Sequence, residues 1–194
     1  MSNNNPLEHF DKWFTEAKEH KDVKEPEAMN ISTATKDGVP SNRMVLLKDY
    51  DDKGFVFYTN LESRKGEQLK QNPKAALCFY WQAMERQIRI EGDVVAVSDE
   101  EADEYFNSRH LKSRIGAWAS KQSRPLKNKA ELVKRVAEFS AKMVTGKVER
   151  PSFWSGFKVI PNRMEFWQAG QYRIHDRVCY TLKDGKWESG LLYP

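Results

Sequence analysis

Short turn sequences separate runs of β-branched and aromatic residues along most of the chain. Lys36-Asp37-Gly38, Asp51-Asp52-Lys53-Gly54 and Lys183-Asp184-Gly185-Lys186 each join two such runs. Because Gly and Asp tolerate the backbone conformations of tight turns, runs joined in this way are expected to pair as antiparallel hairpins. This pattern restricts the chain to an antiparallel sheet or barrel.

Helical patterns lie between and around these hairpins. Apolar residues three or four positions apart indicate amphipathic helices, and Ser98 with Glu101 forms a capping box at one helix start. We expect helices at residues 6–20, 63–71, 98–108, 113–120 and 128–143. We expect seven or eight strands, drawn from residues 29–35, 42–48, 55–59, 75–81, 87–97, 157–167, 173–182 and 187–192. The predicted class is α+β, with helices around an antiparallel sheet or barrel.

Charge and composition exclude several classes of protein. The net charge is only +4, from 32 basic and 28 acidic residues, which is too balanced to indicate a nucleic-acid partner. No apolar run approaches the roughly 18 residues of a membrane span, and residues 1–6 lack the apolar segment of a signal peptide. Cys78 and Cys179 lie in apolar runs without metal-ligand spacing, so we expect two free thiols and no metal. We therefore expect a soluble cytoplasmic protein that binds neither membranes nor nucleic acids.

The segment Arg173-Ile174-His175-Asp176-Arg177 places basic groups at alternate positions. On a strand, Arg173, His175 and Arg177 would share one face. Such a face suits an anion, because arginine is the natural bidentate partner of phosphate. The same spacing fits equally well a solvated edge strand whose charges are paired.

Four further basic or polar clusters are present: Arg43 to Lys48, Ser63-Arg64-Lys65, Lys121-Gln122-Ser123-Arg124, and Tyr105 with Arg109 and Ser113. Taken alone, each fits an ordinary strand end, a solvated helix end or a polar surface. Together they are explained more economically by two anionic ligands, and the nearby aromatic residues could cover a flat ring system. Neither the GxGxxG fingerprint nor a P-loop occurs, so side chains and strand backbone must hold any phosphate.

Several motifs resemble the pyridoxamine 5′-phosphate oxidase family. Met164-Glu165-Phe166-Trp167-Gln168 followed by Arg173 to Arg177 is similar to the family's C-terminal signature, and Arg43 to Lys48 resembles its flavin-binding strand. Further matches are residues 57–60, 63–65, 85–87, 116–118, 121–123 and 151–157. The resemblance spans roughly residues 28–187, in order, so it is far more specific than a single motif.

The resemblance implies a homodimeric split β-barrel at residues 28–194, preceded by a tail, helix and linker at 1–27, with FMN at the subunit interface. It implies that FMN contacts Arg43, Met44, Val45, Leu46, Leu47, Lys48, Tyr58, Thr59, Arg64, Lys65, Gln87, Gln122, Ser123, Trp167 and Arg177. It implies that the substrate contacts Lys48, Tyr105, Arg109, Ser113, Arg173 and His175. Within this set, Arg64 and Lys65 would face the FMN phosphate, and Arg173 and His175 would be catalytic, above the substrate ring.

The implied reaction is oxidation of pyridoxamine or pyridoxine 5′-phosphate to pyridoxal 5′-phosphate, with O2 reduced to H2O2. A hydride would pass from the substrate's C4′ carbon to the flavin. The alternative is a non-catalytic split-barrel module that binds flavin or haem. The presence of Arg173 and His175 together with Tyr105, Arg109 and Ser113 favours the oxidase.

Overall fold

The computed structural model describes residues 5–143 and 148–194. Within these residues, nine antiparallel strands form one sheet in the order β2-β1-β5-β6-β7-β4-β3, with β8 paired to β7 and β9 to β8. The strands are β1 Ala28–Ala34, β2 Pro40–Leu46, β3 Asp49–Asp51, β4 Gly54–Asn60, β5 Lys74–Trp81, β6 Arg86–Ala96, β7 Trp154–Gln168, β8 Asp176–Lys183 and β9 Lys186–Leu191. The helices are α1 Pro6–Glu19, α2 Arg64–Gln71, α3 Asp99–Ser108, α4 Leu111–Ala119 and α5 Lys129–Met143, with 3-10 turns η1 Gln82–Met84 and η2 Gln171–Arg173.

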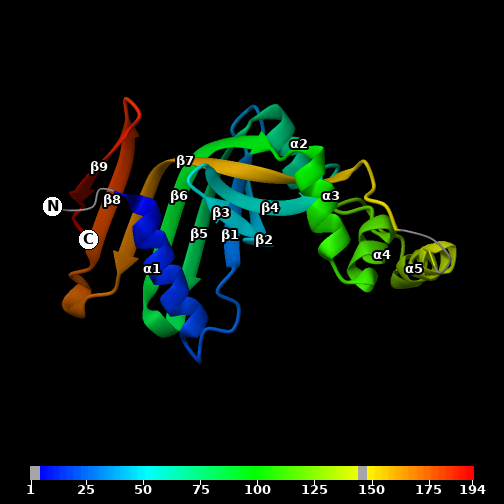
Figure 1. Ribbon diagram of the computed structural model, residues 1–194, viewed down its shortest axis with the longest axis horizontal. Helices are drawn as coiled ribbons and strands as arrows, with labels where there is room; N and C mark the ends of the chain where they lie inside the picture. Colours follow the sequence, from blue (N-terminus) through cyan, green and yellow to red (C-terminus); the bar gives the residue numbers. More distant parts are fainter. Residues whose placement is uncertain (1–4, 144–147) are drawn as a thin grey trace.

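Strand β7 organises the sheet because it pairs along most of its length with β6 and in two halves with other strands. Its first half pairs with β4, from Trp154 to Val159, and its second half pairs with β8, from Arg163 to Gln168. The register between β6 and β7 shifts at Glu91 and Gly92, where the ladder bends. The sheet therefore curls into an open half-barrel, and the expected antiparallel split barrel with peripheral helices is confirmed (Figure 1).

Helix α1 fills the concave side of the curled sheet (Figure 1). Asn5 caps it, Pro6 occupies its first position, and Phe10, Trp13 and Phe14 are buried on one face. The ring of Phe10 lies 4.8 Å from that of Phe55 in β4. Burial of these rings contributes about 2 kcal/mol each, so α1 is part of the same core as the strands.

The remaining helices and the C-terminal strands lie at opposite ends of the molecule. Figure 1 shows α3, α4 and α5 beyond one end of the sheet, and η2, β8 and β9 at the other. A second core joins Phe106 of α3 to Val148 and Trp154. Because the predicted site residues come from both ends, they are separated into two groups within one chain.

One predicted element is wrong. Residues 173–182 do not form a continuous strand, because η2 ends at Arg173 and β8 begins only at Asp176. Tyr172 and Arg173 have φ values of 55° and 65°, which a strand cannot contain. Arg177 is therefore a strand residue, whereas Arg173 and His175 belong to a projecting turn, and the three do not alternate along one strand.

Smaller features complete the description. The short strand β3 was not expected, and β7 begins three residues earlier than predicted. Both cysteines are free, Cys179 buried and Cys78 half-buried. None of the helices in the described parts of the chain is long and apolar enough to cross a membrane.

Candidate active site

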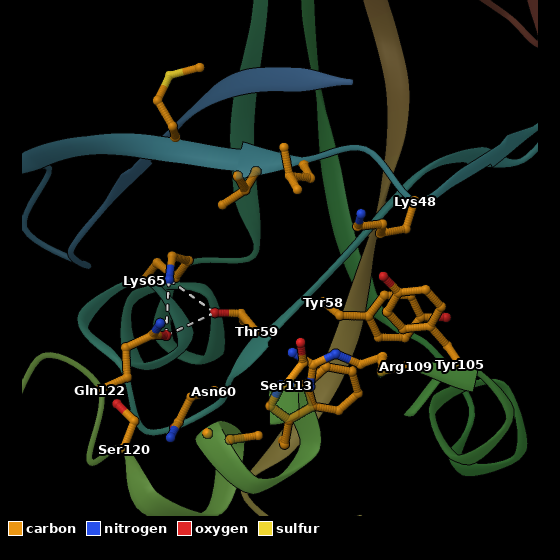
Figure 2. A pocket seen from close by; sticks show the side chains of 16 residues that line it. Lys48, Tyr58, Thr59, Asn60, Lys65, Tyr105, Arg109, Ser113, Ser120 and Gln122 are labelled. Carbon is orange, nitrogen blue, oxygen red and sulfur yellow. Dashed lines mark hydrogen bonds between the residues drawn. The ribbon is translucent and has the colours of Figure 1, made fainter. Parts of the chain in front are cut away.

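A cavity of about 390 Å3 lies between β2, the end of β4 and helices α2, α3 and α4. Its lining residues are Met44, Val45, Leu46, Lys48, Tyr58, Thr59, Asn60, Lys65, Tyr105, Arg109, Ser113, Gly116, Ala117, Ser120, Gln122 and Trp154. Figure 2 shows Lys65, Thr59 and Gln122 on one side of this cavity and Lys48, Tyr105 and Arg109 on the other. The lining holds three cationic side chains and no carboxylate among the described residues.

Lys65 is the buried cation at the first side. Its Nζ donates to Thr59 Oγ1 at 2.9 Å and to Gln122 Oε1 at 3.2 Å, and no carboxylate lies within ion-pair distance in the described chain. Burial, and then the charge of Arg43, lower the pKa of Lys65 to about 8. A buried ammonium held only by neutral oxygens is a favourable place for an anion.

The start of α2 brings Lys65 to this place. Ser63 caps the helix, since its Oγ accepts from the N–H of Gly66 and donates to the carbonyl of Asn60 at 2.6 Å. A side chain at residue 66 would place Cβ 2.5 Å from the carbonyl oxygen of Leu61, so glycine permits the close approach. The end of β4 and the first turn of α2 therefore meet at the cavity.

Arg43 lies beside this helix and is held by two hydroxyl groups. Its guanidinium donates to Thr33 Oγ1 at 2.7 Å and to Ser41 Oγ at 2.6 Å. Both hydroxyls donate to Gln68 Oε1, at 2.6 and 2.7 Å, so their protons point away from the guanidinium. Burial, and then the charge of Arg64, lower the pKa of Arg43. Arg43, Arg64 and Lys65 thus form one positively charged group.

An aromatic stack forms the second side of the cavity. The rings of Tyr58 and Tyr105 lie 4.0 Å apart and almost parallel, and Trp154 lies parallel to Tyr58 at 5.4 Å. The guanidinium of Arg109 covers Trp154 at 4.7 Å. Its Nη1 is buried without a hydrogen-bond partner in the described residues, and burial lowers its pKa. An unpaired buried donor in a cavity that Lys48 and Ser113 also line suits a second anion.

Helices α3 and α4 position this second group. The capping box of Ser98 and Glu101 is formed as predicted, and α3 carries Tyr105 to the cavity before ending at Ser108, with Arg109 as its C-cap. His110 then caps α4, which carries Ser113. The two residues expected to share a helix face, Tyr105 and Arg109, do both line the cavity.

Other predicted residues lie near the cavity without lining it. Leu47 points into the hydrophobic core, with 2% of its surface exposed. Arg64 is exposed, and Ser123 is exposed with a φ of 69° in the loop after Gln122. These three can meet a cavity ligand only through backbone atoms or from the rim.

The remaining predicted residues form a separate group at the other end of the sheet. Gln87, Trp167 and Arg177 face one another across β6, β7 and β8, in one row of the ladder. Arg173 is exposed in η2, and the His175 ring lies 4.7 Å from that of Trp167. His175 Nδ1 accepts the N–H of Gly170 at 3.2 Å. The structure therefore brings the predicted residues together in two groups, which lie at different ends of one chain (Figure 1).

Sequence reasoning missed several cavity residues: Asn60, Gly116, Ala117, Ser120 and Trp154. It also missed Thr33, Ser41 and Gln68 behind Arg43. Trp154, Gly116 and Ala117 lie in motifs that carried the family resemblance, so that signal was available. The hydroxyl and amide contacts of Arg43 depend on the pairing of β1 with β2 and had no local signal.

The donor set fits a phosphorylated flat cofactor such as FMN. Lys65 is buried without a carboxylate partner, and Arg109 Nη1 is buried without a hydrogen-bond partner in the described residues, so both suit anions. The parallel rings offer a flat apolar surface. No group of three or more His, Cys, Asp or Glu side chains suited to a metal ion occurs in residues 5–143 and 148–194.

Comparison with known proteins identifies the family of the chain. Residues 16–143 match the family model "Pyridoxamine 5'-phosphate oxidase", and residues 154–194 match "Pyridoxine 5'-phosphate oxidase C-terminal dimerisation region". A pyridoxine/pyridoxamine 5′-phosphate oxidase of Rhodospirillum rubrum is 51% identical, over 100% of this chain and 98% of its own length. One from Myxococcus xanthus is 52% identical, over 97% of this chain and 91% of its own.

A solved structure is also similar over the full chain. It is PhzG from Burkholderia lata 383 in complex with tetrahydrophenazine-1-carboxylic acid, with a TM-score of 0.93 and 32% identity, covering 100% of this chain and 94% of that one. Two family models and relatives that are about 50% identical over nearly their full length indicate the same protein family. The chain belongs to the pyridoxamine 5′-phosphate oxidase family.

Proposed function

We propose that this protein is an FMN-dependent oxidase that converts pyridoxine or pyridoxamine 5′-phosphate to pyridoxal 5′-phosphate. In the alcohol reaction, the substrate loses two hydrogens and O2 becomes H2O2. In the amine reaction, water also enters and ammonia leaves. The names of full-length relatives at 51% and 52% identity support this choice.

The observation that carries the proposal is the cavity with cations at two sides and no carboxylate in its described lining. Two phosphorylated ligands need two such places. Lys65, with Arg43 and Arg64 behind it, would hold the FMN phosphate, while Lys48, Tyr105, Arg109 and Ser113 would hold the substrate phosphate. Met44, Val45, Leu46, Leu47, Lys48, Tyr58, Thr59, Gln87, Gln122, Ser123, Trp167 and Arg177 would complete the FMN contacts.

A homodimer would explain the division of these residues into two groups. The match of residues 154–194 to a dimerisation region supports pairing of two chains. Exposed apolar side chains near the second group also support it, since Tyr172, Leu191 and Tyr193 are 91%, 83% and 94% exposed. In the proposed dimer, Arg173 and His175 of one chain reach the cavity of the other.

FMN, when bound, supplies two-electron redox chemistry between the substrate and O2. The chain's part is to bind, orient and manage protons. Because His175 Nδ1 accepts from Gly170, the neutral ring carries its proton on Nε2. His175 would then donate a hydrogen bond from Nε2 to the substrate, and Arg173 would orient the substrate by its charge.

The test is an assay for H2O2 with the purified, FMN-loaded protein, using pyridoxine 5′-phosphate, pyridoxamine 5′-phosphate and unphosphorylated pyridoxine. We expect turnover of the phosphorylated compounds only. Replacing Arg109 with Gln should raise KM for pyridoxine 5′-phosphate by about 30-fold, because a charged hydrogen bond to phosphate is lost, while FMN stays bound. Lys127→Gln, which removes a surface charge outside the cavity, should change neither KM for pyridoxine 5′-phosphate nor FMN binding.

Three results would count against the proposal. Retained FMN without any turnover would favour the non-catalytic flavin-binding module. Oxidation of tetrahydrophenazine-1-carboxylic acid in preference to the pyridoxine compounds would favour a substrate like the compound bound to PhzG. Absence of flavin binding would reject flavin-dependent oxidation of either the pyridoxine compounds or tetrahydrophenazine-1-carboxylic acid.

A further inference from the structure

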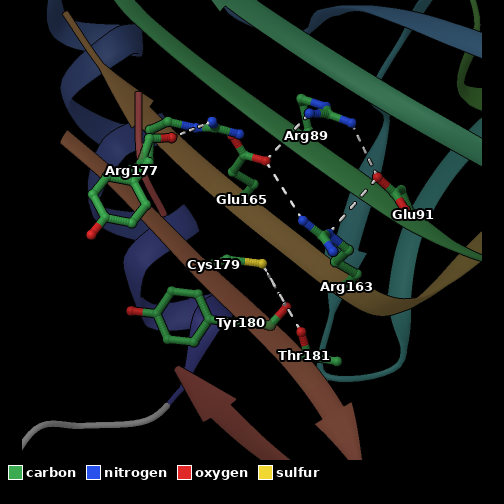
Figure 3. Close-up of polar contacts among 9 residues, drawn as sticks. Arg89, Glu91, Arg163, Glu165, Arg177, Cys179, Tyr180 and Thr181 are labelled. Atoms are coloured by element: carbon green, nitrogen blue, oxygen red, sulfur yellow. Dashed lines mark hydrogen bonds and ion pairs between the residues drawn. The ribbon is translucent and has the colours of Figure 1, made fainter. Parts of the chain in front are cut away.

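Glu165 is a buried carboxylate at the centre of a cluster of arginines on β6, β7 and β8. Its side chain is only 3% exposed. Figure 3 shows Arg89, Arg163 and Arg177 arranged around it. Oε1 accepts from Arg177, and Oε2 lies 3.3 Å from Arg89 and 3.9 Å from Arg163. Nothing in the proposed function assigns a role to this carboxylate.

Arg177 is held more tightly than the other two arginines. Its Nε donates to Glu165 Oε1 at 2.9 Å, and its Nη2 lies 2.7 Å from the same oxygen. Its Nη1 donates to the carbonyl oxygen of Tyr193 at 2.7 Å. The guanidinium is planar and its donors are fixed relative to one another, so these contacts determine its orientation. Nη1 and Nη2 each have a second N–H that these contacts do not use.

The strand register explains why this orientation matters. Glu165 and Trp167 are two residues apart on β7 and therefore share a face. Arg177 is directly opposite Trp167 on the neighbouring strand, and Gln87 is opposite Trp167 on the other side. The carboxylate therefore sets the place of the guanidinium in the row Gln87, Trp167, Arg177.

The charge of the cluster is also unbalanced. Three guanidinium groups meet two carboxylates, because Glu91 pairs with Arg89 at 3.3 Å and approaches Arg163 at 4.0 Å. Glu91 does not reach Arg177. The cluster thus keeps surplus positive charge beside Trp167, which favours an anionic or electron-rich ligand.

We propose that Glu165 is a positioning residue, which holds Arg177 in the orientation needed to bind FMN. This inference rests on the proposed function, in which Arg177 contacts FMN. A buried pair of this kind could instead serve stability alone, so the test must separate the two roles.

The experiment measures the FMN dissociation constant of the apoprotein, by quenching of flavin fluorescence, for Glu165→Gln, Arg177→Gln and the double variant. Glu165→Gln should weaken binding by about tenfold, a loss typical when a residue that orients a ligand-binding group is removed. In the Arg177→Gln background, the same change should have almost no further effect, because its action passes through Arg177. Glu91→Gln is the matched control and should leave the constant within about twofold.

Thermal unfolding of each apoprotein completes the test. If Glu165→Gln lowers the unfolding temperature but leaves the FMN constant unchanged, or weakens FMN equally with and without Arg177, the positioning role is refuted. If Glu165→Gln does not fold, Glu165→Asp replaces it, since the retained charge with a shorter reach should still weaken FMN measurably. Unaltered FMN binding by Arg177→Gln would instead refute the FMN contact assigned to Arg177. Absence of FMN binding by the unmodified protein would refute the proposed function.

Discussion

Lys65 is an ammonium group that the fold keeps in a place unfavourable to its charge. Its partners Thr59 and Gln122 are neutral, and Arg43 adds a repulsive charge. The lowered pKa is the measurable sign of this cost. A dianionic phosphate would relieve the cost, and in the proposed FMN site this would explain why an unfavourable charge is retained.

The pKa of Lys65 predicts how FMN affinity depends on pH. The group is protonated below about pH 8 and loses its charge as the pH rises through that value. Binding to a phosphate needs the charged form, so affinity should fall by up to about tenfold per pH unit above pH 8. Lys65→Arg is the control, because a guanidinium stays charged and should remove the dependence. Titration of the apoprotein with FMN from about pH 7 to pH 9.5 measures the pH dependence of affinity for the unmodified protein and for Lys65→Arg. Equal slopes for the two proteins would contradict the role of Lys65.

At the scale of elements, the strands were predictable because turn chemistry and alternation are local. The capping box of α3 and the apolar face of α1 were read correctly for the same reason. The end of the turn, from Arg173 to His175, was misread as the start of a strand, since left-handed backbone at Tyr172 and Arg173 leaves no mark on the sequence. The division of the site into two groups was also hidden, because it depends on how β7 pairs with β4, β6 and β8.

Gly170 should be essential to this turn. A side chain there would place Cβ 1.7 Å from the carbonyl oxygen of Ile174, so Gly170→Ala must displace the turn. Because a shift of about 1 Å in catalytic groups can cost on the order of 100-fold in rate, we expect turnover to fall by about that factor with FMN still bound.

Gly190→Ala is the control for that change, since no atom of the same chain lies within 4 Å of the added Cβ. Its steady-state kinetics and unfolding temperature should match those of the unmodified protein. Normal turnover by Gly170→Ala would mean that the turn carries no catalytic group.

At the scale of the whole molecule, one chain presents a cavity at one end and the turn with Arg173 and His175 at the other. If both belong to one site, two chains must supply it. The proposed dimer would also cover the exposed side chains of Tyr172, Leu191 and Tyr193.

Assembly and FMN binding should therefore be linked. We expect a species of twice the chain mass by light scattering, and we expect FMN to shift the equilibrium towards it on dilution. Sedimentation at decreasing protein concentration, with and without FMN, measures the shift. A monomer that holds FMN would contradict an interface site.

The separation of the two residue groups has a genetic consequence. A chain with a defective cavity, such as Arg109→Gln, and a chain with a defective turn, such as Arg173→Leu, would each form dimers with impaired turnover at low substrate concentration. A mixed dimer would combine both defects in one site and leave the other site intact. Two loss-of-function alleles should therefore complement each other when expressed together, whereas two alleles affecting the same group should not.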